Sequence, residues 1–458
     1  MQSGNEGDAF RTYDVRGIYS EVLTPALAYK IGRAQVISLS AKKIVVGYDM
    51  RESSGPISSE FIRGATDQGC EVILLGLCTT PTLNFVLSEL GLDGGAMITA
   101  SHCPKEYNGI KLMKSRSLQL YLGGGLEKIR DLAISGELSN ISLAENKGEI
   151  NELKARFAYI QKCKDTALEY SGFKIICDYG NGVGSITAKP FFDQSSAKVV
   201  HMYAEPDGNF PNHPANPHDL ENLSDLQAAV LEIGGDIGIF FDGDGDRAYF
   251  VDEIGKIVMP DLILALLAKH ELANLAEDLG DLKEKVYFDL RMSKVVSEVV
   301  SSNGGEPIVM RVGNPFYKEK LIYDGGIIAG ELSGHIMFSD HYAIDDGLYA
   351  AIKVLNIMTK TGKKLSELIL PFRKYFGSEE INLKVSDANS VLAAVSSAFE
   401  GGERLDIDGV YVKYFHWWLS VRKSNTEPLV RVRLEANSEA LLEEKKKEVL
   451  DVISSFLQ

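Results

Sequence analysis

The stretch Asp236-Ile-Gly-Ile-Phe-Phe-Asp-Gly-Asp-Gly-Asp-Arg-Ala-Tyr-Phe-Val251 sets three aspartates between two apolar runs. Both runs have the β-branched and aromatic content of buried strands. Only glycines separate Asp242, Asp244 and Asp246, so their carboxylates repel one another strongly unless a cation lies among them. Glycine also lets the loop curl until its oxygens converge. Oxygen ligands without His or Cys beside them favour a hard ion, Mg²⁺ or Ca²⁺, over zinc.

Two alternatives compete with a hard-metal site at these aspartates. A solvated acidic turn has the same composition. An EF-hand calcium loop would use Glu253 at its twelfth position, but Arg247 stands where that loop requires glycine. The flanking runs also resemble strands rather than helices. The sequence therefore argues against the EF-hand and leaves the acidic turn as the alternative to a metal site.

A loose repeat extends outward from this stretch over the first three quarters of the chain. In each of three units, a buried-strand run closes on aspartate, a segment that can form a helix follows, and two more β-rich runs come next. The runs are 43–49, 71–76 and 96–99, then 173–178, 198–203 and 236–241, then 286–289, 307–313 and 326–329. This alternation predicts α/β units with mixed, mainly parallel sheets covered on both faces.

Each third run leads directly into a polar loop. The loops are Thr99-Ala-Ser101-His102, the triple-aspartate loop, and Gly330-Glu331-Leu-Ser333-Gly-His335. In sheets of this kind, ligands bind beyond the carboxyl ends of the strands. We therefore expect the three loops to face a shared central cleft.

The C-terminal part of the chain has a different pattern. Runs at 381–385, 409–415, 417–421 and 429–434 predict strands, and 390–399 and 438–457 predict helices, which makes an α+β module. Its hairpin tip, Arg422-Lys-Ser424-Asn425-Thr426-Glu-Pro428, offers a guanidinium, hydroxyls and an amide. Such groups bind phosphate, although a plain polar hairpin has the same composition.

Composition and charge argue against several classes of protein. The 458 residues, 45% hydrophobic and 24% charged, are typical of a globular protein of roughly two to four domains. Its 48 basic and 64 acidic residues give a net charge of −16, which argues against general binding to nucleic acid or to an anionic membrane. We recognise no signal peptide and no membrane-spanning run, and the five scattered cysteines form no C-x-x-C pair. We expect a cytoplasmic protein with reduced thiols.

The first polar loop carries the candidate chemistry. Ser101 follows a strand at a bend, with the base-capable His102 beside it and Lys111 ten residues on. The G-x-S-x-G elbow of serine hydrolases is absent, and a structural turn serine is the simplest alternative. Beside a hard-metal site and a phosphate-binding tip, we interpret Ser101 as a phosphoryl carrier. The metal would neutralise charge on the transferring group, and Lys or His would handle the hydroxyl proton.

Five motifs occur in a fixed order along the chain. They are Tyr13-Asp-Val-Arg16-Gly17, Thr-Ala-Ser101-His102-x-Pro104 with Asn108-Gly109-x-Lys111, Asp242-Gly-Asp244-Gly-Asp246-Arg247, Gly330-Glu331-x-Ser333-Gly334-His335, and Arg422-x-Ser424-Asn425-Thr426-Glu-Pro428. In these motifs, and over essentially its full length, the chain resembles the α-D-phosphohexomutases, the phosphomannomutase and phosphoglucomutase group. The resemblance implies four domains around a central cleft, over 1–152, 153–254, 255–368 and 369–458. The last would be an α+β domain of TATA-binding-protein-like topology.

The resemblance also implies a mechanism. Ser101 would be phosphorylated in the active enzyme, and its phosphate would join Asp242, Asp244 and Asp246 in holding one Mg²⁺. The phosphoserine would convert a phosphosugar substrate, a mannose or glucose phosphate, into a 1,6-bisphosphate, with glucose 1,6-bisphosphate or a similar compound as activator. By the same resemblance, His102 and Lys111 would be the acid and base, and Arg247 would lie near the phosphoserine. Tyr13 and Arg16 would contribute to the cleft, and Glu331, Ser333 and His335 would contact the sugar. The phosphate that is not reacting would be bound by Arg422, Ser424, Asn425 and Thr426. We expect a monomer or homodimer.

Four residues depart from the family's pattern, and one of them, Ala215, breaks a common proline pattern in His213-Pro-Ala-Asn-Pro217. Cys103 replaces the usual Asn of the serine motif, and Arg291 and Asn314 stand where bacterial dual-specificity relatives tend to have Lys and His. The sugar preference therefore stays open, with phosphoglucosamine mutase as the alternative within the enzyme class. In other classes, a phosphatase would pass the phosphate of Ser101 to water, and a non-catalytic phosphosugar-binding protein would never phosphorylate it.

Overall fold

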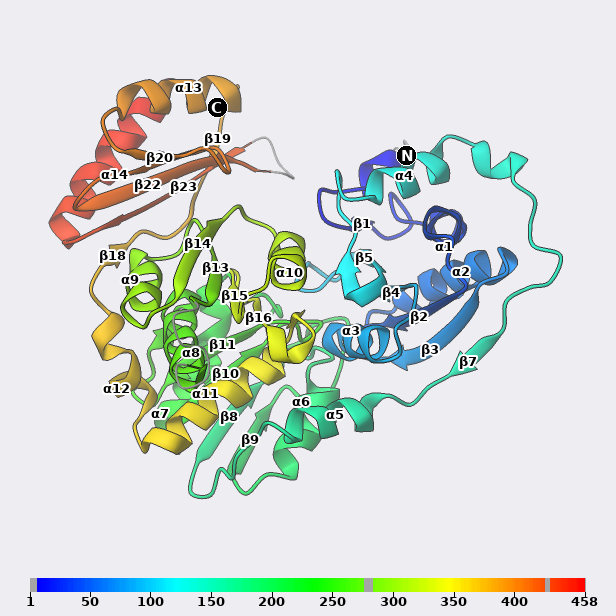
Figure 1. The fold of residues 1–458 in the computed structure, drawn as a ribbon, viewed down its shortest axis with the longest axis horizontal. Helices are drawn as coiled ribbons and strands as arrows, with labels where there is room; N and C mark the ends of the chain where they lie inside the picture. The colour runs from blue at the N-terminus through cyan, green and yellow to red at the C-terminus, as the bar shows by residue number, and fades with distance from the viewer. Residues whose placement is uncertain (1–5, 276–282, 425–428, 458) are drawn as a thin grey trace.

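The described residues, 6–275, 283–424 and 429–457, fold in this computed structural model into four units that follow one another along the chain (Figure 1). Each unit is built on its own sheet, and the sheets have seven, five, five and six strands. In Figure 1 the first unit lies at the right, and the fourth lies at the upper left, next to the third.

The sheet of the first unit has the strand order β1-β5-β4-β2-β3-β7, with β6 paired to β5. Its strands are β1 (Val15–Ile18), β2 (Lys43–Tyr48), β3 (Glu71–Leu77), β4 (Gly94–Ile98), β5 (Tyr107–Lys114), β6 (Leu118–Gln119) and β7 (Ile150–Glu152), and its helices are α1 (Pro25–Leu39), α2 (Ser54–Asp67), α3 (Thr80–Glu89) and α4 (Leu126–Ile134). Ile44 and Val46 face the core beneath α1 and α2, whereas Val45 faces a second core on the opposite side. The apolar run of β2 is thus buried on both faces, as a covered parallel strand requires.

The second and third units repeat this arrangement, in the orders β9-β8-β10-β11-β12 and β14-β13-β15-β16-β17. Their strands are β8 (Lys174–Asp178), β9 (Lys198–Met202), β10 (Ile237–Phe241), β11 (Ala248–Asp252), β12 (Ile257–Val258), β13 (Lys285–Asp289), β14 (Glu306–Met310), β15 (Ile328–Gly330), β16 (Ile336–Phe338) and β17 (Ile344–Asp345). Their helices are α5 (Arg156–Lys164), α6 (Ser185–Asp193), α7 (Ser224–Ile233), α8 (Pro260–Leu275), α9 (Lys294–Ser302), α10 (Asn314–Tyr323), α11 (Gly347–Thr361) and α12 (Leu365–Ile369).

One hairpin recurs in all three units. Three parallel strands form the centre of each sheet, and the third of them turns back into an antiparallel partner: β4 into β5, β10 into β11, and β15 into β16. The expected mixed sheets are confirmed. The polar loops predicted after each third strand are the tips of these hairpins, so they lie at corresponding places in the three units.

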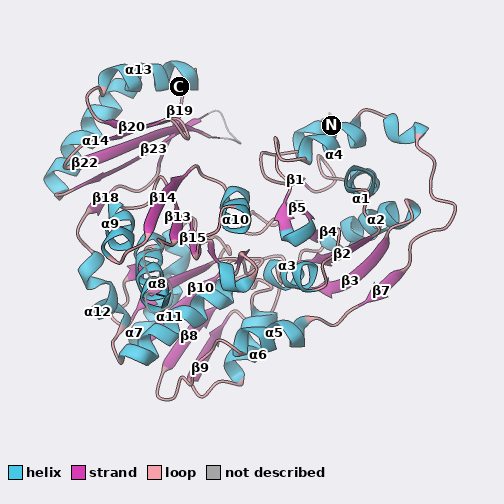
Figure 2. Cartoon of the chain, viewed as in Figure 1, coloured by secondary structure: helices cyan, strands magenta, loops and turns pink. Residues whose placement is uncertain are grey.

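The fourth unit is an α+β module with an antiparallel sheet in the order β18-β23-β22-β21-β20, and β19 pairs with β23. Its elements are β18 (Phe376–Gly377), β19 (Ile381–Lys384), α13 (Ala388–Ala398), β20 (Glu403–Leu405), β21 (Val410–Lys413), β22 (Trp417–Lys423), β23 (Leu429–Ala436) and α14 (Glu439–Ser454). Figure 2 shows both helices on one face of this sheet. The α+β class predicted for the C-terminal part is therefore confirmed.

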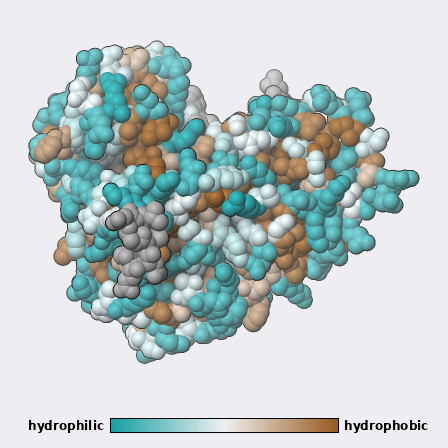
Figure 3. Space-filling view, viewed as in Figure 1, coloured by the Kyte–Doolittle hydropathy of each residue, from teal (hydrophilic) through white to brown (hydrophobic). Residues whose placement is uncertain are grey.

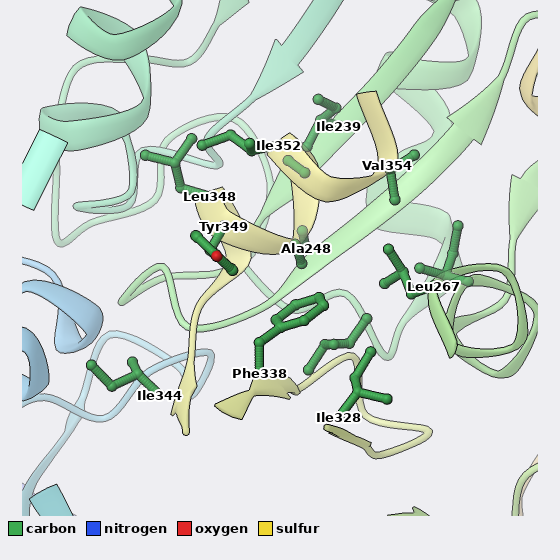
Figure 4. Close-up of a cluster of buried hydrophobic side chains, with 14 of the residues drawn as sticks. Ile239, Ala248, Leu267, Ile328, Phe338, Ile344, Leu348, Tyr349, Ile352 and Val354 are labelled. Atoms are coloured by element: carbon green, nitrogen blue, oxygen red, sulfur yellow. The ribbon is translucent and has the colours of Figure 1, made fainter. Parts of the chain in front are cut away.

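One hydrophobic core extends through the first three units, which also have smaller cores of their own, whereas the core of the fourth unit is separate from it. Helix α11 lies in the shared core, where Ile352 is near Ile239 of β10 and Tyr349 packs against Phe338 of β16 with ring centroids 5.3 Å apart (Figure 4). The fourth unit meets the third through a smaller cluster that includes Trp418. The shared core holds the three hairpin tips in a fixed relation, while the fourth unit is attached by less apolar surface.

The strands predicted from the repeat are present. Each of the nine apolar runs of the first three units overlaps a strand. Among the described residues, no helix combines the length and the apolar character that spanning a lipid bilayer requires.

Candidate active site

The three hairpin tips meet beyond β4, β10 and β15. Gly243 approaches the first tip so closely that a Cβ on it would lie 2.4 Å from the carbonyl oxygen of Ser101, and Gly245 has a φ of 78°. Both positions therefore favour glycine. Arg247 and His335 form an antiparallel bridge between the second and third tips. The loops that the sequence assigned to one cleft contact one another directly.

Ser101 is buried where the first and second tips meet. Its φ of 51° lies in the left-handed region, which a serine occupies only when its surroundings hold it there. The hydroxyl donates to Asp242 Oδ2 at 2.9 Å and accepts from Arg247 Nη2 at 2.7 Å, and His102 Nδ1 is 3.2 Å away. The one hydroxyl thus lies between a guanidinium, a carboxylate and an imidazole.

Arg51, which the sequence did not single out, holds the backbone of the serine loop. It is buried and follows β2. Its guanidinium donates to four backbone carbonyls at 2.6 to 3.0 Å, those of Ser101, Cys103, Pro104 and Tyr107. The only local signal for it is the aspartate that closes the first strand run, because Asp49 accepts from Arg51 Nε at 3.2 Å.

The three aspartates are fully buried and crowded. One oxygen from each lies within 4.8 Å of the other two. Oδ1 of Asp244 and Oδ1 of Asp246 have no hydrogen-bond partner among the described residues. Burial raises the pKa of Asp242 to about 7, although Arg247 opposes this shift. Orphaned oxygens in an all-carboxylate donor set fit a hard divalent cation such as Mg²⁺.

Lys111 and His102 carry opposite protonation states beside this cluster. Lys111 Nζ donates to Asp244 Oδ2 at 2.6 Å and to Asp246 Oδ2 at 2.5 Å. Burial lowers the pKa of Lys111, but the two carboxylates more than offset this and raise it above its ordinary value. Burial and then Arg247 lower the pKa of His102 well below its ordinary value. Lys111 is therefore charged and can donate, whereas His102 is neutral and can accept a proton.

The third tip brings Glu331, Ser333 and His335 to the same place. Glu331 Oε1 accepts from the backbone N–H of Gly313 at 2.8 Å. His335 Nδ1 is 2.8 Å from Ser333 Oγ, and its Nε2 is 3.5 Å from Asp246 Oδ1. Burial alone would lower the pKa of His335. The interactions with Asp246 and Glu331 outweigh burial and raise the pKa to about 10. A charged imidazolium therefore joins the third tip to the aspartates.

A cleft of about 1290 Å³ extends from the three tips to the fourth unit. Figure 3 shows the surface hollowed between the fourth unit at the upper left and the first at the right. All four units contribute to its walls, among them Tyr13, His102, Arg247, Arg291, Asn314, Glu331, Ser333, His335 and Arg422. This volume is large enough for a small-molecule ligand.

The fourth unit reaches the cleft through β22. Arg422 is buried on this strand, and its Nη2 donates to Glu380 Oε2 at 3.1 Å. Ser424 follows the strand directly. Asn425 and Thr426, the other two residues predicted at this tip, lie outside the described residues.

Tyr13 lines the cleft in the first unit, and Arg16 lies beside the serine loop. Tyr13 donates through its hydroxyl to the carbonyl of Val312 at 2.8 Å and so connects the first unit to the third. Arg16 Nη2 donates to Asp14 Oδ2 at 2.5 Å, and its Nη1 donates to Cys103 Sγ at 3.1 Å. The cysteine that departs from the family's serine motif is therefore an acceptor for Arg16.

Arg291 and Asn314, two further departures from the family's pattern, line the cleft. Arg291 Nε donates to Asp289 Oδ2 at 2.9 Å, and Arg291 Nη1 donates to Glu380 Oε2 at 3.1 Å. Asn314 Nδ2 donates to Asp345 Oδ2 at 2.8 Å. Both side chains are in place to contact a ligand, and both are tied to carboxylates.

Two further site residues were not indicated by any motif. Thr80 Oγ1 donates to Asp244 Oδ2 at 2.5 Å, and His218 Nε2 is 3.1 Å from Arg247 Nη1. Thr80 belongs to the Thr-Thr-Pro helix start after β3, a polar signal at a strand end that could have suggested it. His218 lies in a loop that offers no such signal.

Comparisons with known proteins match every unit of the chain. Four family models match in order: Phosphoglucomutase/phosphomannomutase alpha/beta/alpha domain I over residues 7–129, domain II over 157–255, domain III over 259–375, and the C-terminal domain over 380–452. Each matched range covers most of one sheet, and only the edge strands β7, β12 and β18 lie outside the four ranges.

Relatives match nearly end to end. The chain is 34% identical over 443 residues to a phosphomannomutase/phosphoglucomutase of Pseudomonas syringae pv. tomato, which covers 95% of this chain and 92% of the relative. It is 33% identical over 455 residues to a phosphomannomutase of Methanocaldococcus jannaschii, covering 98% of each. It is 34% identical over 462 residues to a phosphoglucomutase of Neisseria gonorrhoeae, covering 98% and 97%. The crystal structure of a Phosphoglucomutase/phosphomannomutase family protein from Burkholderia thailandensis superposes with a TM-score of 0.89 at 28% identity, covering 98% and 97%.

Proposed function

The chain belongs to the phosphoglucomutase/phosphomannomutase family, whose members are phosphotransferases of the isomerase class, and we propose that it interconverts the 1- and 6-phosphates of mannose or glucose through a phosphorylated Ser101. Relatives of similar identity are named for mannose, for glucose, or for both. The proposal therefore includes both sugars.

One observation carries this proposal. Ser101 Oγ lies 2.7 Å from a guanidinium nitrogen of Arg247 and 2.9 Å from a carboxylate oxygen of Asp242, at the edge of the buried aspartate cluster. A structural turn serine needs neither partner. A phosphoryl group on this oxygen would meet a fixed cation on one side and a metal-binding donor set on the other.

The aspartate cluster supports a magnesium site. Asp242, Asp244 and Asp246 would hold one Mg²⁺ together with the phosphate of Ser101, and the ion would neutralise charge on the transferring phosphoryl group. Lys111 compensates two of these carboxylates in the structure. Asp244 Oδ1 is the donor that remains for a cation, whereas Asp246 Oδ1, which also has no hydrogen bond, lies 3.4 Å from Arg247 Nε and 3.5 Å from His335 Nε2.

The transfer itself exchanges one phosphorus–oxygen bond for another. The bond between phosphorus and Ser101 Oγ breaks as a bond to the free substrate hydroxyl forms, and the product is a hexose 1,6-bisphosphate. Neutral His102, which lies 3.2 Å from Ser101 Oγ, is the candidate acceptor for the hydroxyl proton. Charged Lys111 is the candidate donor of the proton that Ser101 Oγ takes up as its bond to phosphorus breaks. After the intermediate turns over, its other phosphate returns to Ser101.

The rest of the cleft would hold the substrate in either orientation. The third tip is suited to sugar hydroxyls because Glu331 accepts hydrogen bonds and Ser333 and His335 can donate them. The fourth unit is suited to the phosphate that is not reacting, because Arg422 binds phosphate in a forked geometry. Ser424, Asn425 and Thr426 would add donors there, and Tyr13 and Arg16 would close the cleft in the first unit.

Intact-protein mass spectrometry tests the function. We expect incubation with glucose 1,6-bisphosphate to add one phosphoryl group, and peptide mapping to place it on Ser101. A coupled assay should then detect glucose 6-phosphate or mannose 6-phosphate from the 1-phosphates, and glucosamine 1-phosphate serves as the competing substrate. An unphosphorylated Ser101 under every condition contradicts the proposal. Release of inorganic phosphate without sugar 6-phosphate would identify a phosphatase instead.

Replacing Arg422 by alanine should act mainly on substrate affinity. The lost charged hydrogen bonds are worth roughly 1.5–3 kcal/mol, which is about a 10- to 150-fold rise in KM. Steady-state kinetics with glucose 1-phosphate measure this rise. The matched control is Arg404→Ala, an exposed arginine of the same unit that donates to Ser396. A wild-type KM for Arg422→Ala would remove Arg422 from the phosphate site.

A further inference from the structure

A single carboxylate, that of Glu380, holds three arginines from two units at the wall of the cleft. Its Oε2 accepts from Arg291 Nη1 and from Arg422 Nη2, each at 3.1 Å. Its Oε1 accepts from Arg431 Nη1 at 3.1 Å. Arg291 follows β13 in the third unit, whereas the other two arginines lie on β22 and β23 of the fourth. Glu380 itself lies in the fourth unit, in the short loop between β18 and β19.

The positive charges of the arginines in this cluster outnumber the negative charges of the carboxylates. Asp289 also pairs with Arg291, so two carboxylates face three guanidinium groups. The side chains of Arg291 and Arg422 are only 8% and 4% exposed, so solvent screens their repulsion poorly. Burial raises the pKa of Glu380, but Arg291, Arg422 and Arg431 together hold it far below its ordinary range. The carboxylate therefore stays charged and stays among the arginines.

The cluster also contains hydrogen-bond donors that Glu380 does not satisfy. Nε of Arg422 and Nε of Arg431 are buried and have no acceptor among the described residues. Both carboxylate oxygens of Glu380 already accept from the three arginines. A phosphate monoester brings three terminal oxygens and close to two negative charges, and guanidinium groups bind it in a forked geometry. A phosphate group therefore suits these arginines better than the carboxylate does.

We propose that Glu380 is a displaceable internal carboxylate, which a phosphate group of the substrate replaces at Arg291, Arg422 and Arg431. This inference rests on the proposed function. It adds that the Glu380 carboxylate competes with phosphate for the arginines and so sets the affinity for phosphate at this site. In a mutase each phosphate must be held and then released in turn. A resident carboxylate lowers the net gain on binding, because phosphate must first displace it, and it takes the arginines back when phosphate leaves. Arg291 and Arg431 thereby join Arg422 in one anion site.

Inorganic phosphate is the probe, because titration calorimetry measures its binding without turnover. Glu380→Gln removes the competing charge at nearly constant size, so its Kd for phosphate should fall about tenfold, or ~1.4 kcal/mol. Glu379→Gln is the matched control, because it removes the same charge from the exposed neighbouring residue, and it should bind phosphate as the wild type does. A Kd for Glu380→Gln that is unchanged or weaker overturns the proposal.

Thermal unfolding gives a second readout, since Glu380→Gln leaves three arginines without their shared carboxylate. Saturating phosphate should raise the unfolding midpoint of Glu380→Gln more than that of the wild type. An equal or smaller rise also overturns the proposal. Activity separates this inference from the function on which it rests: a wild-type protein without mutase activity contradicts the function, whereas the phosphate titration still decides the displacement.

Discussion

Replacing Ser101 by alanine is expected to lower mutase turnover by about 10⁴-fold or more, because the variant has no oxygen to carry the phosphoryl group. The rest of the site should remain assembled. Arg247 Nε still donates to Asp242 Oδ2 at 2.9 Å, and Arg51 still holds the backbone carbonyl of residue 101. Loss of activity with an intact fold is therefore the expected result, which circular dichroism and the coupled assay measure together.

Ser58→Ala is a matched control for this variant. Ser58 is a buried serine on α2 whose hydroxyl donates to the carbonyl of Gly55 at 2.9 Å, so its loss removes a buried hydroxyl of the same unit. This variant should keep wild-type turnover and should gain one phosphoryl group from glucose 1,6-bisphosphate. If Ser101→Ala retained turnover, or accepted the phosphoryl group at another residue, the carrier would have to be sought elsewhere.

The fold could be predicted where its signals are local. The apolar run of β2 is followed by Asp49, and the equivalent strands β8 and β13 end on Asp178 and Asp289. A strand covered on both faces needs such a continuous apolar run. The pairing order is not local. Nothing in the run at 94–98 specifies that β4 turns back on β5 through a hairpin, and this hairpin places the three polar loops at corresponding sites.

The candidate site also has features that local sequence signals predict and features that they do not. Ser101 and the three aspartates could be proposed because each loop carries its reactive groups within a few residues. Arg51 and Glu380 could not, because each acts on partners far along the chain: Arg51 holds the carbonyl of a residue 50 positions away, and Glu380 pairs with Arg422, 42 positions away. Only the packing of the units brings such charges together, and no short motif encodes that packing.

Asp244→Asn is expected to lower both the affinity of the site for Mg²⁺ and the rate of turnover, and both effects have one electrostatic cause. The amide keeps the size of the side chain but removes one of three negative charges from a fully buried cluster, and an orphaned oxygen of Asp244 is among the donors available to a cation. We expect the Mg²⁺ concentration for half-maximal activity to rise by about tenfold or more, and turnover at saturating Mg²⁺ to fall by roughly 10²- to 10³-fold.

The affinity measured in the Mg²⁺ titration should also depend on whether Ser101 is phosphorylated. In the proposed site the serine phosphate is a ligand beside the three carboxylates, so the phosphorylated wild-type protein should bind Mg²⁺ more tightly than the dephosphorylated one, and Asp244→Asn should reduce that gain. Asp252→Asn is the control, because Asp252 is equally buried but lies at the far end of the same hairpin, paired with Ile237. A Mg²⁺ titration unaffected by Asp244→Asn, or shifted equally by Asp252→Asn, would contradict the metal site at the aspartate loop.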